Sequence, residues 1–250
     1  MSNHPAPVAL ITGSATGVGR ACAVRFAQLG YDIVVNYSRS EDDAEETVRL
    51  VEQQGRTALL QQCDVRSDQQ VRAMFAAVRE RFGRLDVLVN NAAMTHFVAH
   101  ADLDGMTETK WDEILATNVK GAFFVTRAAV PLLKSAESAA IVNISSVAGV
   151  TGQGSSIAYC ASKAALNSMT KSLARVLAPT IRVNAVCPGP IDTRWLRSVM
   201  SSEELQARAA DCLIPRPAQP DDVADTVIYL ATGTQLTTGQ CLTIDGGRTI

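Results

Sequence analysis

The stretch VALITGSATGVG, residues 8–19, decides the fold of this 250-residue chain. It begins as a short apolar run typical of a buried strand, continues into a glycine-rich turn and then opens a helical pattern. Its glycines allow backbone angles and close approaches that side chains block, and the N-terminus of the following helix attracts phosphate. The spacing is G-x-x-x-G-x-G rather than the usual G-x-G-x-x-G. We therefore expect a turn that holds the diphosphate of a dinucleotide, with a plain tight turn as the alternative.

The same alternation of short apolar runs and longer amphipathic stretches continues along the chain. The strand-like runs are residues 8–12, 33–36, 57–64, 87–90, 140–145, 182–187 and 241–245, and helical patterns include residues 19–29, 42–54, 69–82 and 113–133. Continuously apolar strands joined by helices form a parallel sheet that is covered on both faces. No linker or repeat interrupts the pattern. The sequence predicts one α/β domain over residues 1–250, a doubly wound sheet.

Composition argues against several classes of function. The chain is 47% hydrophobic and 19% charged, with a net charge of −2 and scattered Lys and Arg, so neither nucleic acid nor membrane is an expected partner. A polar N-terminus and the lack of a long apolar run favour a cytoplasmic protein. The six cysteines lack C-x-x-C spacing and are interpreted as small buried hydrophobic residues. Three histidines are too few to predict a metal site.

A tyrosine and a lysine four residues apart, Tyr159 and Lys163, share one face of a predicted helix. A neighbouring cation lowers the pKa of a phenol, which gives a proton donor and acceptor suited to an alcohol or carbonyl. Ser146 precedes Tyr159 by thirteen residues and follows a strand-like run. A serine hydrolase is not expected, because Ser146 has no G-x-S-x-G turn and neither His96 nor His100 has an evident orienting acid.

These motifs together resemble the short-chain dehydrogenase/reductase family, in order and in spacing, over essentially the whole chain. They are Thr12-Gly-x-x-x-Gly-x-Gly19, Asn90-Asn91-Ala92, Asn118, Ser146, Tyr159-x-x-x-Lys163, Pro188-Gly189, Thr238-Gly239-Gln240 and Asp245-Gly246-Gly247. The resemblance implies a Rossmann fold with a seven-stranded parallel sheet, NAD or NADP as cofactor, and commonly a homotetramer. One departure is Ala93, where the family often has glycine.

The resemblance also implies roles for four catalytic residues. Tyr159 is the general acid in reduction and the base in oxidation, and Lys163 lowers its pKa and holds the nicotinamide ribose. Ser146 polarises the substrate carbonyl, with Ser145 as the alternative. Asn118 connects to the lysine through a water.

Further residues are implied as cofactor contacts. They are Gly13, Ser14, Thr16, Gly17, Val18 and Gly19 in the turn, Asn91, Ala92 and Ala93 after the fourth strand, Tyr159 and Lys163, and Pro188, Gly189, Ile191 and Thr193 near the nicotinamide. Asp64 and Val65 match adenine contacts, although Asp64 could instead cap a helix that starts near Ser67.

NADP(H) is favoured over NAD(H), which stays possible. An acid at the end of the second strand would bind the ribose 2′-hydroxyl, and this chain has Asn36 there. Arg39 is suited to a 2′-phosphate, aided by Ser38 and Ser40, unless it is an ordinary solvated turn residue. Against this preference, Thr16 stands where many NADP-using relatives carry a basic residue.

The resulting function is hydride transfer between a nicotinamide and a small carbonyl or alcohol substrate. The chain most resembles 3-oxoacyl-carrier-protein reductases and glucose-dehydrogenase-like members of the family. Alternatives are a cofactor-binding sensor without activity, a sugar or polyol dehydrogenase, and a dehydratase or epimerase. Residues 194–217 break the strand–helix rhythm and are interpreted as a cover over the substrate or as a surface helix pair.

Overall fold

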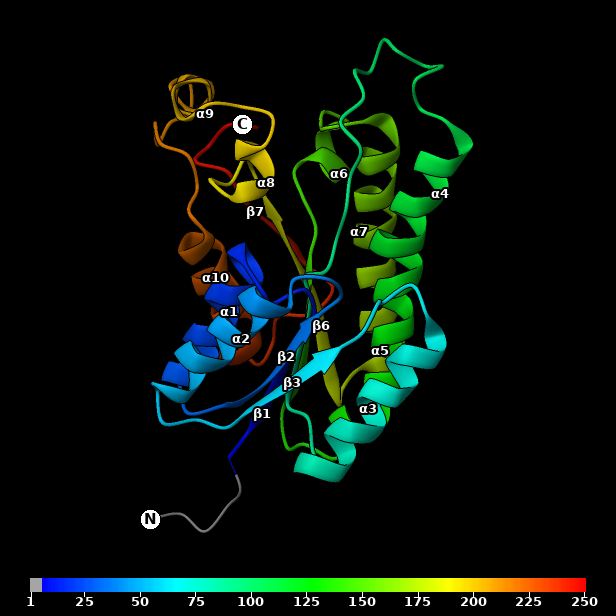
Figure 1. The fold of residues 1–250 in the computed structure, drawn as a ribbon, viewed down its shortest axis with the longest axis vertical. Helices are drawn as coiled ribbons and strands as arrows, with labels where there is room; N and C mark the ends of the chain where they lie inside the picture. The colour runs from blue at the N-terminus through cyan, green and yellow to red at the C-terminus, as the bar shows by residue number, and fades with distance from the viewer. Residues whose placement is uncertain (1–5) are drawn as a thin grey trace.

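All seven strands of the sheet run parallel, in the order β3-β2-β1-β4-β5-β6-β7 (Figure 1). The computed structural model describes residues 6–250. The strands are β1 (Val8–Ile11), β2 (Asp32–Tyr37), β3 (Ala58–Gln62), β4 (Val87–Asn90), β5 (Ala139–Ile144), β6 (Ile181–Pro188) and β7 (Cys241–Ile244). The ends of each strand lie within one residue of the predicted apolar run, except that β3 stops two residues early at its carboxyl end. The predicted doubly wound parallel sheet is therefore confirmed.

Helices cover both faces of this sheet (Figure 1). One face carries α1 (Gly17–Gln28), α2 (Glu41–Glu52) and α10 (Pro220–Ile228), and the other carries α3 (Asp68–Phe82), α5 (Ala122–Leu133) and α7 (Ile157–Leu177). Because side chains alternate along a strand, Ala9 and Ile11 enter the first core while Val8 and Leu10 enter the second. No helix among residues 6–250 combines the length and apolarity needed to cross a membrane.

A chain of buried amides ties α7 to the middle of the sheet. Asn90 donates from Nδ2 to Asn143 Oδ1 at 2.9 Å, and Asn143 donates to Thr170 Oγ1 on α7 at 2.8 Å. Buried amides are stable only where they find such partners. These hydrogen bonds therefore fix α7, the helix that carries Tyr159 and Lys163, relative to β4 and β5.

The helical pattern predicted over residues 113–133 is not one regular helix. It divides into α4 (Glu108–Leu115), the π-helical turn η1 (Ala116–Gly121) and α5, with a second π-helical turn, η2 (Tyr229–Gly233), after α10. A π-helical turn is frequent at functional sites, and η1 contains the predicted catalytic residue Asn118. At its end, a Cβ on Gly121 would stand 2.8 Å from Val65 Cγ2, so this turn packs tightly against the chain after β3.

The segment 194–217 forms two short helices, α8 (Arg194–Arg197) and α9 (Ser202–Ala209). Together with α6 (Ala148–Thr151), they lie beyond the carboxyl ends of the strands (Figure 1). This is the edge of a doubly wound sheet where ligands bind.

Candidate active site

One large cleft, with a volume of about 1420 Å³, opens at the carboxyl ends of the strands. Most of the predicted site residues border it: Gly13, Thr16, Gly17, Val18, Asn36, Ser38, Arg39, Asp64, Val65, Asn91, Ala92, Ala93, Ser146, Tyr159, Lys163, Pro188, Gly189, Ile191 and Thr193. Four predicted residues, Ser14, Gly19, Ser40 and Asn118, are not part of its wall.

The glycine-rich turn presents the start of α1 to this cleft. Gly13 and Gly17 have φ angles of 62° and 55°, which favour glycine. Thr16 makes no side-chain cap on α1, and the first turn of this helix contains no acidic residue. Gly17 and Val18 border the cleft, so the N-terminal N–H groups and the positive end of the helix dipole face it. These features fit the diphosphate of a nicotinamide dinucleotide.

Gly19 acts differently from the glycines that border the cleft. A Cβ at this position would stand 2.5 Å from the Gly13 carbonyl oxygen and 2.6 Å from Asn91 Nδ2. Because Gly19 has no side chain, α1 can pack directly against the glycine-rich turn. Its role is this close packing, not the provision of space for the diphosphate.

Asn36 and Ser14 support the turn from inside the protein. Asn36 accepts a hydrogen bond from Gly13 N at 3.0 Å and donates to the carbonyl oxygens of Gln61 and Cys63. Ser14 Oγ donates to the Ile11 carbonyl oxygen and accepts from Asn36 N. Both side chains are buried and already partnered. They therefore shape the turn, and a direct contact of either residue with the cofactor stays a prediction.

Two arginines, Arg39 and Arg66, border the adenosine end of the cleft and have different surroundings. Arg66 binds both carboxylate oxygens of Asp64, and these hydrogen bonds lower the pKa of Asp64, with a smaller contribution from the charge of Arg39. Among residues 6–250, no carboxylate lies within ion-pair distance of Arg39. Ser67 caps α3 by accepting from Gln70 N, so Asp64 is not the cap.

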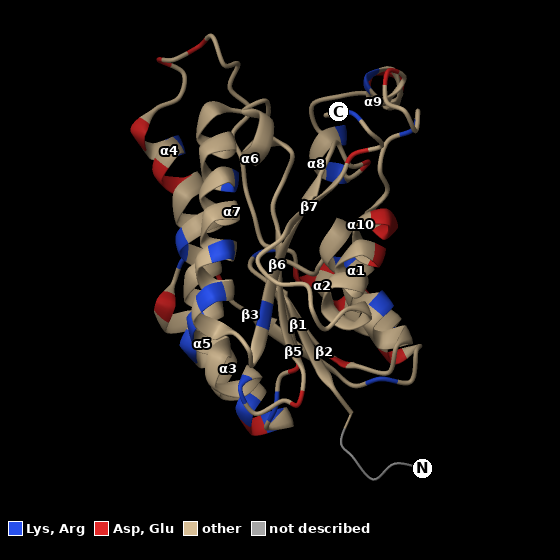
Figure 2. Cartoon of the chain, turned by 180° about the vertical axis from the view of Figure 1, so that it is seen from behind, with Lys and Arg blue, Asp and Glu red and all other residues tan. Residues whose placement is uncertain are grey.

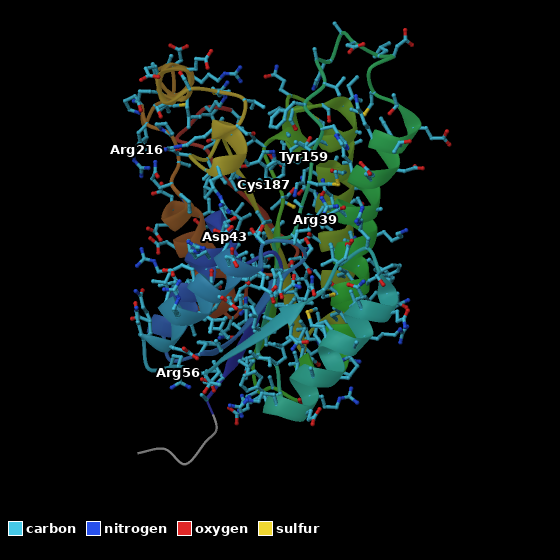
Figure 3. The ribbon with its side chains drawn as sticks, in the orientation of Figure 1. Arg39, Asp43, Arg56, Tyr159, Cys187 and Arg216 are labelled. Carbon is cyan, nitrogen blue, oxygen red and sulfur yellow. The ribbon has the colours of Figure 1, made fainter. Side chains whose placement is uncertain are left out.

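Three of the four predicted catalytic residues, Ser146, Tyr159 and Lys163, border the cleft, and Arg39 lies below Tyr159 in the view of Figure 3. Lys163 is only 2% exposed, and its Nζ donates to the Ile144 carbonyl oxygen at 2.8 Å and lies 5.6 Å from the centre of the Tyr159 ring. Ser146 Oγ accepts from Ala148 N at 3.1 Å and donates to the Pro188 carbonyl oxygen at 3.5 Å, and its interaction with Tyr159 works to lower the pKa of the phenol. Ser145 instead donates to the Lys163 carbonyl oxygen at 3.2 Å. The geometry favours Ser146 over Ser145.

Burial determines the protonation states of Tyr159 and Lys163. Desolvation raises the pKa of Tyr159 to about 12, which the interaction with Ser146 only partly opposes, and desolvation lowers the pKa of Lys163 to about 8. The expected lowering of the phenol pKa by Lys163 is therefore not found. Its physical reason is that burial disfavours both charged forms. Tyr159 is a neutral acid at neutral pH, able to donate a proton.

Asn118 lies behind the catalytic wall. Its carboxamide accepts from Met94 N at 2.8 Å, and donates to the Met94 carbonyl oxygen and to Ser162 Oγ, both at 3.0 Å. These bonds join the segment after β4 to α7. They include no direct contact with Lys163, so a water-mediated link to the lysine stays a prediction.

Two further features of the cleft were not recognised from the sequence. His96 Nε2 lies 2.8 Å from Glu113 Oε2, so the expectation that neither histidine has an acidic partner is wrong for His96. The edge of the Trp195 ring packs against Tyr159, with ring centres 6.1 Å apart at 77°. Both pairs join residues from separate segments, 17 and 36 positions apart, and only the fold brings them together.

The cysteines are also not uniformly buried. Cys212 and Cys241 are partly exposed. The Cys187 thiol donates to Asn167 Oδ1 at 3.6 Å and the Cys241 thiol to the Asn167 carbonyl oxygen at 3.9 Å, and the interaction between the two thiols lowers the pKa of Cys241 while it raises the pKa of Cys187. Cys241 is therefore a partly exposed thiol, not the small buried hydrophobic residue that the sequence predicted. Within residues 6–250, no group of three or more His, Cys, Asp or Glu side chains is placed to hold a metal.

Comparison with known proteins gives the same family from sequence and from structure. The enoyl-(acyl carrier protein) reductase family model matches residues 13–249. The chain is 41% identical over 243 residues to a Streptomyces violaceoruber protein assigned as ketoacyl reductase 2 of the granaticin polyketide synthase, covering 97% of this chain and 96% of the relative. It is 38% identical to the 3-oxoacyl-[acyl-carrier-protein] reductase of Staphylococcus aureus, with 96% of each chain covered.

Two solved structures extend this likeness to three dimensions. A Burkholderia xenovorans protein assigned to the short-chain dehydrogenases/reductases superposes with a TM-score of 0.91 at 35% identity, covering 99% of each chain. The acetoin dehydrogenase of Salmonella typhimurium superposes with a TM-score of 0.85 at 34% identity, covering 97% of this chain and 96% of the other. The chain belongs to the short-chain dehydrogenase/reductase family and is an NAD(P)-dependent oxidoreductase that acts on a carbonyl or alcohol group.

Proposed function

We propose that this protein reduces the ketone of a 3-oxoacyl-type substrate with NADPH, using Tyr159 as the proton donor. The observation that carries the proposal is that Ser146, Tyr159 and Lys163 border the same cleft as the glycine-rich turn. The relatives named as ketoacyl and 3-oxoacyl reductases support this substrate class.

The chemistry divides between cofactor and protein. A nicotinamide dinucleotide would be held with its diphosphate at the glycine-rich turn and its nicotinamide near Pro188 and Gly189, and it would supply the hydride. Tyr159 Oη donates its proton to the carbonyl oxygen, and Ser146 Oγ donates a hydrogen bond to the same oxygen. The buried ammonium of Lys163 stabilises the negative charge left on Tyr159, because a charge in a dry site acts strongly on its neighbours. Asn118 positions the lysine's helix through Ser162.

The preference for NADP(H) rests on Arg39. Its guanidinium has no carboxylate partner among residues 6–250 and stands beside Ser38 at the adenosine end of the cleft. A guanidinium binds phosphate oxygens in a forked geometry. Because Asn36 is neutral, it does not repel a 2′-phosphate. The homotetramer and the cytoplasmic location stay predictions.

A substrate panel tests this function. The purified protein is mixed with NADPH or NADH and with ketones, 3-oxoacyl thioesters and keto sugars, and loss of absorbance at 340 nm is followed. We expect the highest kcat/KM with a 3-oxoacyl thioester and NADPH. Higher kcat/KM with NADH would contradict the role of Arg39, and exclusive turnover of sugars would contradict the substrate class.

A further inference from the structure

Two arginines at the far end of the cleft lack acidic partners. Arg208 on α9 and Arg248 in the tail after β7 both border the cleft, and Arg248 Nη1 donates to the Arg208 carbonyl oxygen at 2.6 Å. Among residues 6–250, no carboxylate lies within 4 Å of either guanidinium. By contrast, Arg194, which borders the same cleft, is paired with Asp43 at 2.8 Å.

The tail that carries Arg248 is held in place. The carboxylate of Asp245 accepts hydrogen bonds from Gly247 N at 2.9 Å, from Thr249 N at 3.0 Å and from Thr249 Oγ1 at 2.7 Å. Asp245 also packs against Gly189, where a Cβ would stand 3.0 Å away. Basic residues of α8, α9 and this tail lie around the C-terminus (Figure 2). The two guanidinium groups therefore come from an anchored tail and a neighbouring helix.

The net charge of the cleft around Arg208 and Arg248 is positive. Two acidic side chains border the cleft, and each has a partner: Asp64 pairs with Arg66, and Glu113 bonds His96. Asp245, whose carboxylate is bound only by backbone N–H and hydroxyl donors of the tail, lies beside both arginines and offsets one of their two charges, while Asp222 is paired with Arg216. A second negative charge supplied by a ligand would restore neutrality there.

An apolar wall separates these arginines from the catalytic tyrosine. Trp195, Val199 and Met200 border the cleft, and Trp195 contacts Tyr159 directly. A substrate whose carbonyl lies at Tyr159 would pass this wall before it reaches Arg208 and Arg248. Such an arrangement suits a molecule with a carbonyl at one end, an apolar middle and an anion at the other.

We propose that Arg208 and Arg248 form a subsite for an anionic group, a carboxylate or a phosphate, carried by the substrate at a distance from its carbonyl. The proposal rests on the proposed function, in that it places the reacting carbonyl at Tyr159. Arginine binds both anions through paired N–H···O bonds, and two adjacent arginines strengthen the contact.

Matched substrate pairs test the subsite. One pair is the acetoacetyl thioester of 4′-phosphopantetheine and that of pantetheine; the other is 7-oxooctanoate and its methyl ester. The double variant Arg208→Ala/Arg248→Ala should lower kcat/KM at least tenfold for an anionic member and change its neutral partner less than twofold. A response in the first pair identifies phosphate, and a response in the second identifies carboxylate. Equal losses within both pairs, or no loss in either, would overturn the proposal.

A control and a binding measurement complete the design. Arg72→Ala removes an exposed arginine of α3 that is paired with Asp68 and borders neither the cleft nor the adjoining hollow lined by Arg208 and Arg248, and it should leave all four substrates unaffected. Calorimetry with 4′-phosphopantetheine, pantetheine, octanoate and methyl octanoate needs no turnover. If no carbonyl is reduced but an anionic probe binds at least tenfold more weakly to the double variant, the proposed function fails and the subsite stands. Unchanged binding of both anions would remove the subsite.

Discussion

The two ends of the cleft are built in different ways. The glycine-rich turn is fixed by the side chains of buried Asn36 and half-buried Asn91, whose hydrogen bonds end on backbone atoms of the turn. The far end is formed by α8, α9 and the C-terminal tail, where Trp195 is 38% exposed and Arg208 and Arg248 lie on the surface. The first end is specified by backbone geometry and the second by exposed side chains.

This difference has a functional meaning. A dinucleotide is the same molecule in every turnover, so a rigid turn whose polar groups are already satisfied is suited to it. Substrates differ between relatives, and side chains on short helices can change without disturbing the sheet. Substitutions at the first end should therefore affect cofactor binding most, and substitutions at the second end should affect substrate selection.

The largest effect is expected from Gly19→Ala. Its methyl group would stand 2.5 Å from the Gly13 carbonyl oxygen and 2.8 Å from Ser14 Cα, so the backbone of the turn must shift. We expect NADPH to bind at least about 100-fold more weakly, which corresponds to ~2.7 kcal/mol. Fluorescence titration measures the affinity, and circular dichroism checks that the variant is folded. Gly30→Ala is the control: its φ of 89° strains an alanine without crowding and it does not border the cleft, so it should lower stability but leave the NADPH affinity unchanged. Unchanged affinity in folded Gly19→Ala would contradict the rigid-turn account.

An intermediate effect, a fall in kcat/KM for reduction, is expected when the pH rises above 8. Burial lowers the pKa of Lys163 from 10.5 to about 8, so the charge is present below pH 8 and is lost as the pH rises through this value. The kcat/KM for reduction should be level below pH 8 and fall about tenfold per unit well above it. Lys163→Arg keeps its charge to pH 10 and should remove the decline from whatever activity remains. A wild-type plateau extending to pH 10 would show that Lys163 is not the titrating group.

The smallest effect is expected at the far end of the cleft, from Trp195→Ala. Loss of the ring exposes Tyr159 to water, so the raised pKa of the phenol should fall toward its ordinary value. We expect KM for the carbonyl substrate to rise several-fold, while the dissociation constant of NADPH stays within twofold. Val176→Ala, which truncates another exposed apolar side chain, is the control. A change in NADPH affinity as large as that in KM would mean that the two ends are not separable.

Sequence reasoning was strongest where function depends on local pattern. Strand, glycine-rich turn and helix follow one another within residues 8–29, and Tyr159 and Lys163 lie one helical turn apart, so both could be recognised directly. The inward direction of Asn36 could not, because it depends on carbonyl groups of β3 that become neighbours only in the sheet. The raised pKa of Tyr159 depends on burial, which the Tyr-x-x-x-Lys spacing does not report.

The arrangement of side chains at the far end of the cleft could largely not be predicted from the sequence. In the segment 194–217, α8 borders the cleft and α9 contributes Arg208 to its lining, while a role as a cover over the substrate stays a prediction. The meeting of Arg208 with Arg248 joins residues forty positions apart, and no periodic signal marks it. The π-helical turn around Asn118 was likewise missed, because its sequence continues the helical pattern on both sides.

The central claim, that the Tyr159 hydroxyl delivers the proton, is tested most directly by Tyr159→Phe. This variant keeps the ring against Trp195 and removes only the oxygen. With saturating NADPH and the best carbonyl substrate of the panel, we predict that kcat falls by about 10²–10⁴-fold, while the dissociation constant of NADPH changes less than threefold. A folded Tyr159→Phe protein with near wild-type kcat would contradict the mechanism.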